Sequence, residues 1–439
     1  MHHTARVFLF TMLAAAAAAA QDSPKLSLRQ TLEVAEKESP DVQLALLRQV
    51  EAQARSLVAR SAYQPQLGVA VGNTYQTSNM EGIGLLIPGF PERLGPYRVF
   101  NARPQLTAPV FDLQILSGIH AARERVVESK YNAETARQAT LLAVLELDIN
   151  LFQAESRIAA AAARLRTAQA VHQQAEQSEA AGSASKLDLA RTAQQVFAER
   201  ANLAEATRDR DVVRAMLLQA IGLEQNAQIQ IEAPELENFA ERLRSVNVIR
   251  SGAFEERSEL NALEAERRAA QFDREAAQRE RLPKLAFSGD YGVLGQGPDR
   301  SLSTYTVGGS LTIPLFTGGR IRANVDAAQS KVAQAEAELR KTRLRVSEEV
   351  ERAAIESDAS RDTLSAAASA TAEARKALEL SRLRFRAGIS TSVDVATAES
   401  ALAQSEDFEI RTRYDWYLAE ARLARAEGNV YWFFDRGAR

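Results

Sequence analysis

The chain contains no cysteine among its 439 residues and only four histidines. The absence of cysteine excludes disulfide bonds, thiolate metal sites, cysteine nucleophiles and a lipid attached to an N-terminal cysteine. His2 and His3 stand at the very start of the chain, whereas His120 and His172 are far apart on one predicted helix. No histidine-based metal site is therefore expected.

Motifs that carry common catalytic chemistry are also missing. The chain has neither a Gly-x-Ser-x-Gly nucleophile elbow nor a P-loop, and no pair of acids stands near a plausible base. Its net charge is only −3, so no strongly basic field is available to attract nucleic acid. We accordingly expect no enzymatic activity, no cofactor, no metal site and no nucleic-acid partner.

Long apolar runs are confined to the first 20 residues. There Arg6 precedes an apolar stretch and an alanine tract, and Ala18-Ala19-Ala20 before Gln21 fits a small-residue cleavage site. This pattern predicts a signal peptide over residues 1–20; the alternative is a buried N-terminal helix. Because no later run reaches the roughly 18 apolar residues of a helical span, the mature chain is expected to be soluble or to enter a membrane as strands.

Four motifs of the first half recur in the second half in the same order, which indicates an internal duplication. Their spacing is 218 positions for the first pair and 205 or 206 for the others. The duplication predicts one structural repeat over residues 21–230 and another over 231–439. The pairs are Gln64–Leu67 with Leu282–Leu285, Leu106–Phe111 with Leu311–Phe316, Ala181–Asp188 with Ala387–Asp394, and Gly222 with Gly428.

Each repeat contains two segments with the period of a strand. Leu67, Val69, Val71 and Tyr75 alternate with small and polar residues, which is typical of a strand with one apolar face. We predict strand pairs at 66–78 with 98–111 and at 284–294 with 303–316. The loop 79–97 is unusually apolar and has no assigned role. Four prolines, which suit changes of structure type, are expected at the helix–strand junctions: Pro65, Pro109, Pro283 and Pro314.

Very long helices follow the strand pairs, at 113–180 and 319–387. Apolar residues in the second of them step by four and three, with one slip of phase, as in a coiled coil with a stutter. Such a helix is roughly 100 Å long at ~1.5 Å per residue. The seam positions are Ile321, Val325, Ala328, Val332, Ala335, Leu339, Val346, Val350, Ala353, Leu364, Ala367, Ala374, Leu378 and Phe385.

A short polar turn closes each long helix, at 181–188 and 387–394, and a return helix follows, at 188–221 and 394–427. On the residues alone, Asp188 and Asp394 suit the positive end of a new helix and need be no more than caps. The return helices are about half as long as their partners. Helices at 28–62 and 255–281 have the length and polarity to cover the remainder.

The strand segments set a geometric requirement. Ten or more residues can cross a bilayer when tilted, but four strands are too few to close a barrel. Open edges in lipid would leave backbone groups unsatisfied, at several kcal/mol each. If these strands lie in a membrane, several chains must therefore combine. The thin alanine-rich seams of the long helices point to the same requirement, since they could close side by side into a tube.

The sequence resembles the TolC family of bacterial outer-membrane channel proteins over essentially the whole mature chain. The resemblance rests on the duplicated helix–Pro–strand pairs, the Leu-Thr-x-Pro-x-Phe joints and an aromatic-x-x-Gly, x5, Asp-Val signature. The signature stands at Phe385, Gly388 and Asp394-Val395; the first repeat has Glu179 in place of the aromatic residue. The fold it implies is mostly α with membrane β: a duplicated long-helix coiled-coil α-barrel, with four strands per chain of a trimeric twelve-stranded outer-membrane β-barrel.

The resemblance also implies a role and partners. Family members are passive homotrimeric conduits from the periplasm to the exterior in tripartite efflux or type I secretion systems of Gram-negative bacteria. They lie in outer-membrane lipid, with the helices in the periplasm. The hairpin tips meet a periplasmic adaptor that joins an inner-membrane pump, and acids near the second tip form a gate. The matching residues are Gly182, Asp188, Phe385, Gly388 and Asp394 at the tips, and Asp394 with Thr397, which replaces an acid, at the gate.

A soluble periplasmic coiled-coil adaptor or scaffold is the alternative. The strands discriminate between the two, because a channel requires an apolar stripe on all four strands and an adaptor does not. The exported substrate cannot be read from the residues in either case, because the pump selects it.

Overall fold

The computed structural model describes residues 25–435 except 81, 83, 85–88, 90, 92, 182–184, 228–229, 232–251, 388 and 390–391. The predicted signal peptide lies outside these residues, as does most of the apolar segment 85–90. The chain forms two compact units. We call residues 46–133 with 258–343 the sheet unit, and residues 1–45, 134–257 and 344–439 the core unit. Each unit takes segments from both halves, so the units cut across the two sequence repeats.

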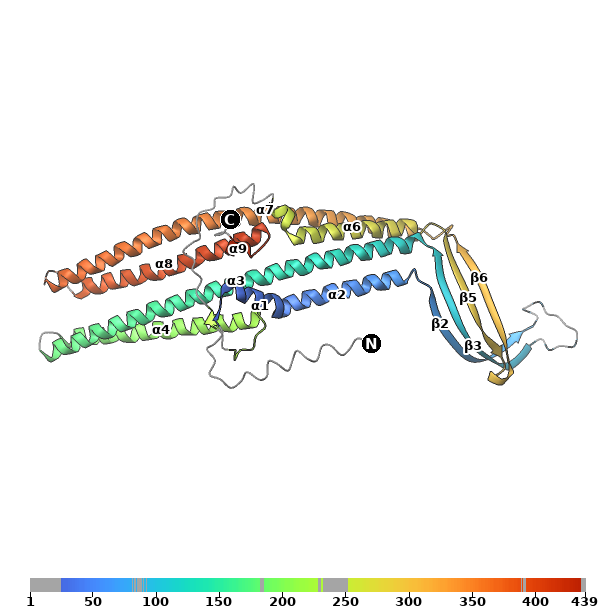
Figure 1. Ribbon diagram of the computed structural model, residues 1–439, viewed down its shortest axis with the longest axis horizontal. Coiled ribbons are helices and arrows are strands. Elements are labelled where there is room, and N and C mark those ends of the chain that lie inside the picture. Colours follow the sequence, from blue (N-terminus) through green and yellow to red (C-terminus); the bar gives the residue numbers. More distant parts are fainter. Residues whose placement is uncertain are drawn as a thin grey trace. The chain divides into compact units, whose positions relative to one another are not determined.

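The sheet unit contains four antiparallel strands in the order β2-β3-β5-β6 (Figure 1). Their bounds are Gln66–Asn79, Arg93–Phe111, Lys284–Gly295 and Ser301–Thr312. β2 and β5 match the predicted segments to within one residue, whereas β3 begins five residues before its predicted start. A short 3-10 helix, Pro298–Arg300, lies in the turn before β6. The predicted mostly helical fold with two strand pairs is confirmed.

The two Leu-Thr-x-Pro-x-Phe motifs differ in structure, and the sequence analysis was wrong to treat them alike. β3 continues through Pro109 to Phe111 because β5 still pairs with it there, through Pro109–Ala286 and Phe111–Leu285. On the other side of β3 the ladder with β2 ends at Thr107, so Pro109 lies where β3 pairs with one neighbour only, a position that tolerates proline. β6 instead stops at Thr312, where β5 begins, and Pro314 lies beyond the strand. Pro65 and Pro283 directly precede β2 and β5.

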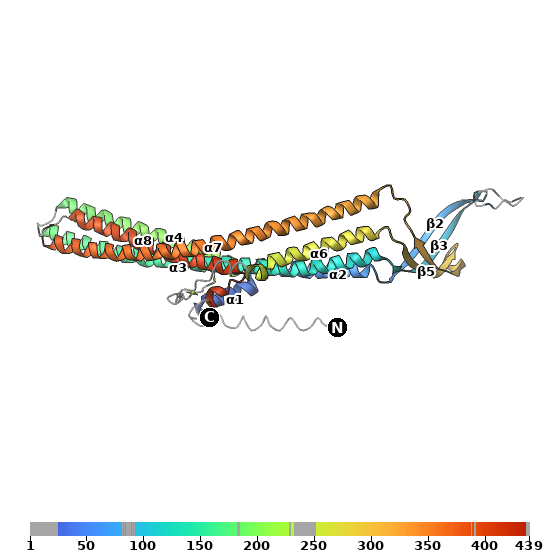
Figure 2. The same ribbon diagram turned by 90° about the horizontal axis from the view of Figure 1, so that it is seen from above.

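The helices of the sheet unit follow the order of the strands. α2 (Pro40–Ser61), α3 (Leu113–Ala180), α6 (Ser258–Arg279) and α7 (Arg320–Arg386) connect to β2, β3, β5 and β6 respectively (Figure 2). Polar contacts join neighbours in this order, such as Arg268 with Glu124 at 2.7 Å between α6 and α3. Arg343 of α7 likewise contacts Glu264 of α6 at 2.9 Å.

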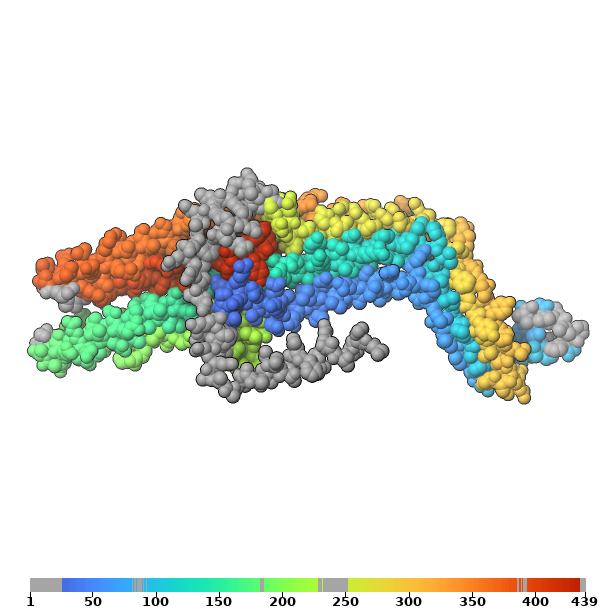
Figure 3. Space-filling model, in the orientation of Figure 1, coloured from blue at the N-terminus to red at the C-terminus, as the bar shows by residue number. Residues whose placement is uncertain are grey.

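The core unit is built around one apolar cluster. It joins α1 (Leu28–Glu38), α3, α4 (Lys186–Ala220), α8 (Ser392–Glu427) and the short α9 (Trp432–Asp435). On the outside of the molecule, Figure 3 shows the blue N-terminal helix α1 next to the red C-terminal segment. Its largest fully buried side chains include Phe433, Leu32 and Leu141. The cluster is also where β1 (Lys25–Leu26) and β4 (Gln230–Ile231) form a small parallel pair.

The predicted helix at 28–62 is broken, which corrects the sequence analysis. α1 ends at Glu38 and α2 begins with Pro40. Proline has no N–H to donate to a carbonyl of the preceding turn, so it cannot continue α1, but it suits the first position of a new helix. A matching break occurs at Arg257, between the helical residues 252–256 and α6. The sequence analysis overlooked Pro40, which was the available signal.

Glycines at the ends of the return helices contact these two breaks. Gly222, with φ +78°, comes just after α4 and lies against the backbone of Glu38. A Cβ at this position would overlap the Glu38 carbonyl. Gly428, with φ +130°, follows α8, and a Cβ there would lie 2.7 Å from the Cβ of Glu256. Both positive φ values favour glycine. The repeated glycines therefore occupy equivalent joints in the two halves.

Burial along the long helices confirms the predicted seam. Val332, Ala335, Leu339, Val346 and Val350 are all at most 5% exposed on α7. Thr342, which is 2% exposed, occupies the position between Leu339 and Val346 that the apolar pattern left empty. The steps from Thr342 to Val346 and Val350 are both of four residues, which places the stutter there.

Asp148 is an unexpected residue in the apolar core. Its side chain, on α3, is fully buried, and neither carboxyl oxygen has a hydrogen-bond partner among the described residues. Burial raises its pKa well above the usual value, because the charged form would lose its hydration. The position that corresponds in the second repeat, at a spacing of 206, is Ala354.

We expect Gly222→Ala to destabilise the protein by about 1–3 kcal/mol, since the new Cβ meets a carbonyl at a positive φ. Gly118→Ala is the matched control, because Gly118 lies within α3 and has open space at its Cβ position. That substitution should stabilise the helix by roughly 0.5–1 kcal/mol. Thermal unfolding of the full chain in detergent would measure both; equal effects of the two substitutions would contradict the role of the joint.

Asp148→Asn should change how stability depends on pH. An acid whose pKa is higher in the folded than in the unfolded state is protonated in both states at low pH and then has no effect on stability. As the pH rises from the unfolded pKa to the folded pKa, the acid ionises more readily in the unfolded state, so the free energy of unfolding falls. The wild type should therefore lose stability relative to the variant from about pH 4 upward, by about 1.4 kcal/mol for each unit of pKa elevation. Unfolding midpoints at pH 4.5 and 8 test this, with Asp326→Asn at an exposed position as control.

Candidate functional site

The sheet has one apolar face. In an antiparallel ladder, paired residues point to the same side and alternate along each strand, so the register assigns every side chain to a face. On one face most side chains are apolar, and many are well exposed, as for Leu67 at 73% and Tyr305 at 75%. The polar residues of this face include Ser303 and the pair Asn73 and Arg98, in which Arg98 donates to Asn73 at 2.7 Å. The apolar face comprises Leu67, Val69, Val71, Tyr75, Phe100, Ala102, Leu106, Leu285, Phe287, Tyr291, Val293, Tyr305, Val307 and Leu311.

The opposite face is polar. At its centre, Arg103 donates to Asp290 at 2.7 Å, to Thr304 at 3.2 Å and to Asn101 at 2.6 Å. Gly292 leaves room for this arginine, because a Cβ on Gly292 would overlap Arg103. The other polar-face residues include Gln66, Thr74, Gln76, Gln105, Thr107, Ser288 and Thr306.

All four strands therefore carry an apolar stripe on one side and hydrogen-bonding groups on the other. This arrangement suits strands that separate hydrocarbon from water. An apolar stripe on all four strands is the feature that we expected of a channel and not of a soluble adaptor.

The edges of the sheet are open. Within the described chain, β2 and β6 each pair on one side only. Apolar side chains are exposed beside both edges: Leu57 and Val58 of α2 are 65% and 70% exposed, and Leu315 and Phe316 after β6 are both 91% exposed. An unpaired edge with exposed apolar neighbours is suited to pairing with another chain.

The first hairpin tip joins α3, which ends at Ala180, to α4, which begins at Lys186. Ser185 caps α4, and its hydroxyl donates to Asp188 at 2.7 Å while the Asp188 N–H donates back to the hydroxyl at 3.2 Å. These hydrogen bonds from Ser185 lower the pKa of Asp188. Asp188 is therefore the N3 partner of Ser185 in a capping box, in which its carboxylate also accepts from the Ser185 N–H. Gly182, predicted for this tip, lies outside the described residues.

The second tip joins α7 to α8. Phe385 belongs to the last turn of α7, Asp394 lies exposed in the first turn of α8, and Gly388 falls outside the described residues. Thr397 is also exposed, and its hydroxyl donates to the Val393 carbonyl at 2.8 Å. Asp394 and Thr397 thus share one end of α8.

Two features of the site escaped the sequence analysis. Arg103 and Asp290 could be assigned to strands from alternation, but their pairing across 187 positions depends on the register of three strands. The close approach of Arg103 to Gly292 depends on the same register. The bulge between Pro109 and Phe111 shows why spacing alone does not fix it.

The described helices include none with the length and apolar character of a membrane span. In the same part of the chain, no three acidic, histidine or cysteine side chains gather as metal ligands would.

Comparison with known proteins identifies the family. The model of the outer membrane efflux protein family matches residues 31–223 and 249–429. The pyoverdine export outer membrane protein OpmQ of Pseudomonas putida is 25% identical over 417 residues, which cover 92% of this chain and 86% of that protein.

Solved structures share the fold. A membrane protein from Pseudomonas aeruginosa has a TM-score of 0.81 at 22% identity, covering 91% of this chain and 93% of that one. The outer membrane protein VceC of Vibrio cholerae has a TM-score of 0.78 at 18% identity, covering 92% and 96%. The chain is therefore a TolC-like member of the outer membrane efflux protein family and a protein of the outer membrane.

Proposed function

We propose that three copies of this chain form a passive conduit from the periplasm to the exterior. Each copy would add four strands to a twelve-stranded barrel in the outer membrane, with its helices forming a periplasmic tunnel. The single observation that carries the proposal is the two-faced sheet with open edges at β2 and β6. Those edges leave backbone groups that only another chain can pair in lipid.

The apolar residues beside the edges support self-association. Leu315 and Phe316 follow β6, and Leu57 and Val58 belong to the helix that leads into β2. Copies joined from β6 to β2 would bring these two groups of side chains together. Burying them would add to the ladder bonds a hydrophobic contribution of about 25 cal/mol for each Å² removed from water.

The polar face would then line the pore. Arg103 is neutralised by Asp290, and the rest of this face consists mainly of amide and hydroxyl groups. Such a lining interacts with water and with polar solutes and has little net charge. That suits a conduit whose cargo is selected elsewhere, by an inner-membrane pump of an efflux or type I secretion system.

The hairpin tips are proposed as contacts for a periplasmic adaptor. This role is assigned to Gly182, Asp188, Phe385, Gly388 and Asp394 because they match the family signature. Asp394, with Thr397 one turn further along α8, is the proposed gate. A single acid per chain would place one carboxylate from each of three copies around the closed end.

The apolar face predicts which strand positions tolerate charge. Val69→Lys should reduce assembly in the outer membrane, because a lysine facing lipid near the midplane costs about 2–4 kcal/mol. Gly68→Lys is the matched control, since the preceding residue points to the polar face, lies opposite Gln105 and has open space at its Cβ position. The heat-resistant oligomer recovered from outer-membrane fractions would be quantified. Equal recovery of the two variants would mean that Val69 does not face lipid.

The conduit itself is tested in planar bilayers. The purified oligomer should have the mass of three chains and should conduct ions. Asp394→Asn should weaken block by divalent cations, because it removes the proposed ring of carboxylates. Asp188→Asn, at the first tip, should leave the block unchanged. A monomer without conductance would refute the proposed function, whereas unchanged block in Asp394→Asn would refute only the gate.

A further inference from the structure

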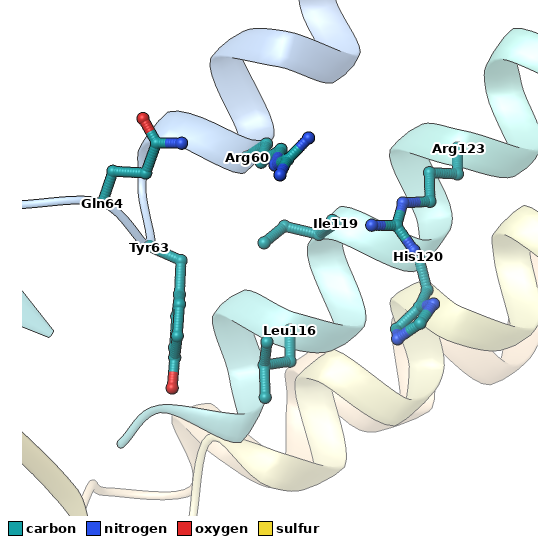
Figure 4. A pocket seen from close by; sticks show the side chains of 7 residues that line it. All are labelled: Arg60, Tyr63, Gln64, Leu116, Ile119, His120 and Arg123. Atoms are coloured by element: carbon teal, nitrogen blue, oxygen red, sulfur yellow. The ribbon is translucent and has the colours of Figure 1, made fainter. Parts of the chain in front are cut away.

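We propose that a pocket between α2 and α3 binds the phosphate of a membrane phospholipid. The pocket has a volume of about 300 Å³ and lies within the sheet unit, just below the ends of β2 and β3. Figure 4 shows Arg60 of α2 and Arg123 of α3 on either side of Ile119, with His120 further along the same wall. The proposal rests on the outer-membrane placement of the strands and adds a ligand to it.

Within the part of the chain that the structure describes, the two arginines have no acidic partner. Among the described residues, no carboxylate lies within 4.0 Å of Arg60 or Arg123, whereas the nearby Arg125 and Arg268 are each paired with an acid. Arginine presents a planar fork of donors that matches phosphate oxygens. Two such groups from different helices can hold one phosphate from both sides.

The remaining walls suit the rest of a lipid. His120 also lines the pocket, and its ring stacks on Phe272 of α6 with 5.3 Å between the ring centres, which fixes the position of the ring. Leu116, Ile119 and the Tyr63 ring supply apolar surface for the glycerol and the start of an acyl chain. A free phosphate ion would leave this apolar surface unused.

The location fits the boundary of the membrane. Tyr63 precedes β2 by three residues, and its hydroxyl donates at 3.1 Å to the carbonyl of Val110, at the end of β3. Leu116 follows the end of β3 by five residues. The pocket therefore begins within about two helical turns of strands that cross the hydrocarbon layer, at the depth of lipid headgroups.

The side of the helix also fits. Lys284 lies on the polar face of the sheet, and its side chain donates to Gln114 of α3 at 2.6 Å. Arg123 follows Gln114 by nine residues, which are about two and a half turns of a helix with ~3.6 residues per turn. The two side chains therefore project from opposite sides of α3. Arg123 thus lies on the opposite side of α3, which continues the apolar, lipid-facing side of the sheet.

The duplication provides an internal comparison. At the repeat spacings of 218 and 206, Arg60 corresponds to Gln278 and Arg123 to Gln329. Both positions are neutral in the second repeat, and Gln329 accepts a hydrogen bond from Arg274 at 3.1 Å. Each chain should therefore bind one such lipid, against the first repeat only.

Replacing both arginines tests the site. Arg60→Gln with Arg123→Gln copies the second repeat, and should reduce binding of dioctanoyl phosphatidylethanolamine to the detergent-purified oligomer at least tenfold. Arg48→Gln with Arg322→Gln removes the same charge at exposed positions and should leave binding unchanged. Arg123→Lys should retain part of the affinity, because it keeps the charge but loses the fork. Native mass spectrometry would count the bound lipids and verify the oligomer.

Further probes identify the ligand. Binding of dioctanoylglycerol, which lacks phosphate, with the same affinity would overturn the proposal, as would equal binding of inorganic phosphate or undiminished lipid binding by the double glutamine variant. The conductance of the same preparations separates this outcome from failure of the channel. A conducting oligomer that ignores the lipid refutes the pocket alone, whereas a preparation that never conducts refutes the proposed function.

Discussion

Backbone hydrogen bonding at the edges of the sheet is the constraint on which the rest of the structure depends. Within the described chain, β2 and β6 each pair along one side only. In the proposed membrane barrel the unpaired backbone groups would lie in lipid, where water cannot replace the missing partners. The shortness of the sheet, its two-sided chemistry and the exposed apolar residues beside its edges all agree with a unit completed by further copies. The helix order α2-α3-α6-α7 extends the same arrangement, since each helix continues from one strand.

Duplication gives the chain two equivalent joints but not two equivalent halves. Gly222 and Gly428 end matching helices against matching breaks, so the backbone repeats closely. The side chains diverge: Asp148 corresponds to Ala354, the arginine pocket to a pair of glutamines, and the continuous strand end at Pro109 to an interrupted one at Pro314. The first repeat thus carries charged groups that the second lacks. In the proposed trimer, each of these groups would occur three times rather than six.

The sequence was sufficient for most elements because their signals are local. A period of two identified β2 and β5. Heptads with one stutter placed α7 almost to the residue, and the internal duplication placed α3 as its counterpart. Register was inaccessible, because Arg103 and Asp290 meet only once three strands are aligned. The end of β6 was missed for a related reason: a strand ends where its partner ends, and that partner is far away in sequence. The roles of Gly388 and Asp394 came from resemblance, and they remain predictions.

The bare strand edges also have a consequence for biogenesis. Before other copies are met, every newly exported chain presents two unpaired ladders, with Leu315 and Phe316 almost fully in contact with water. Pairing into the proposed trimer would then compete with non-specific aggregation through the same edges. The yield of functional conduits should consequently depend on holding folding intermediates apart in the periplasm until insertion begins.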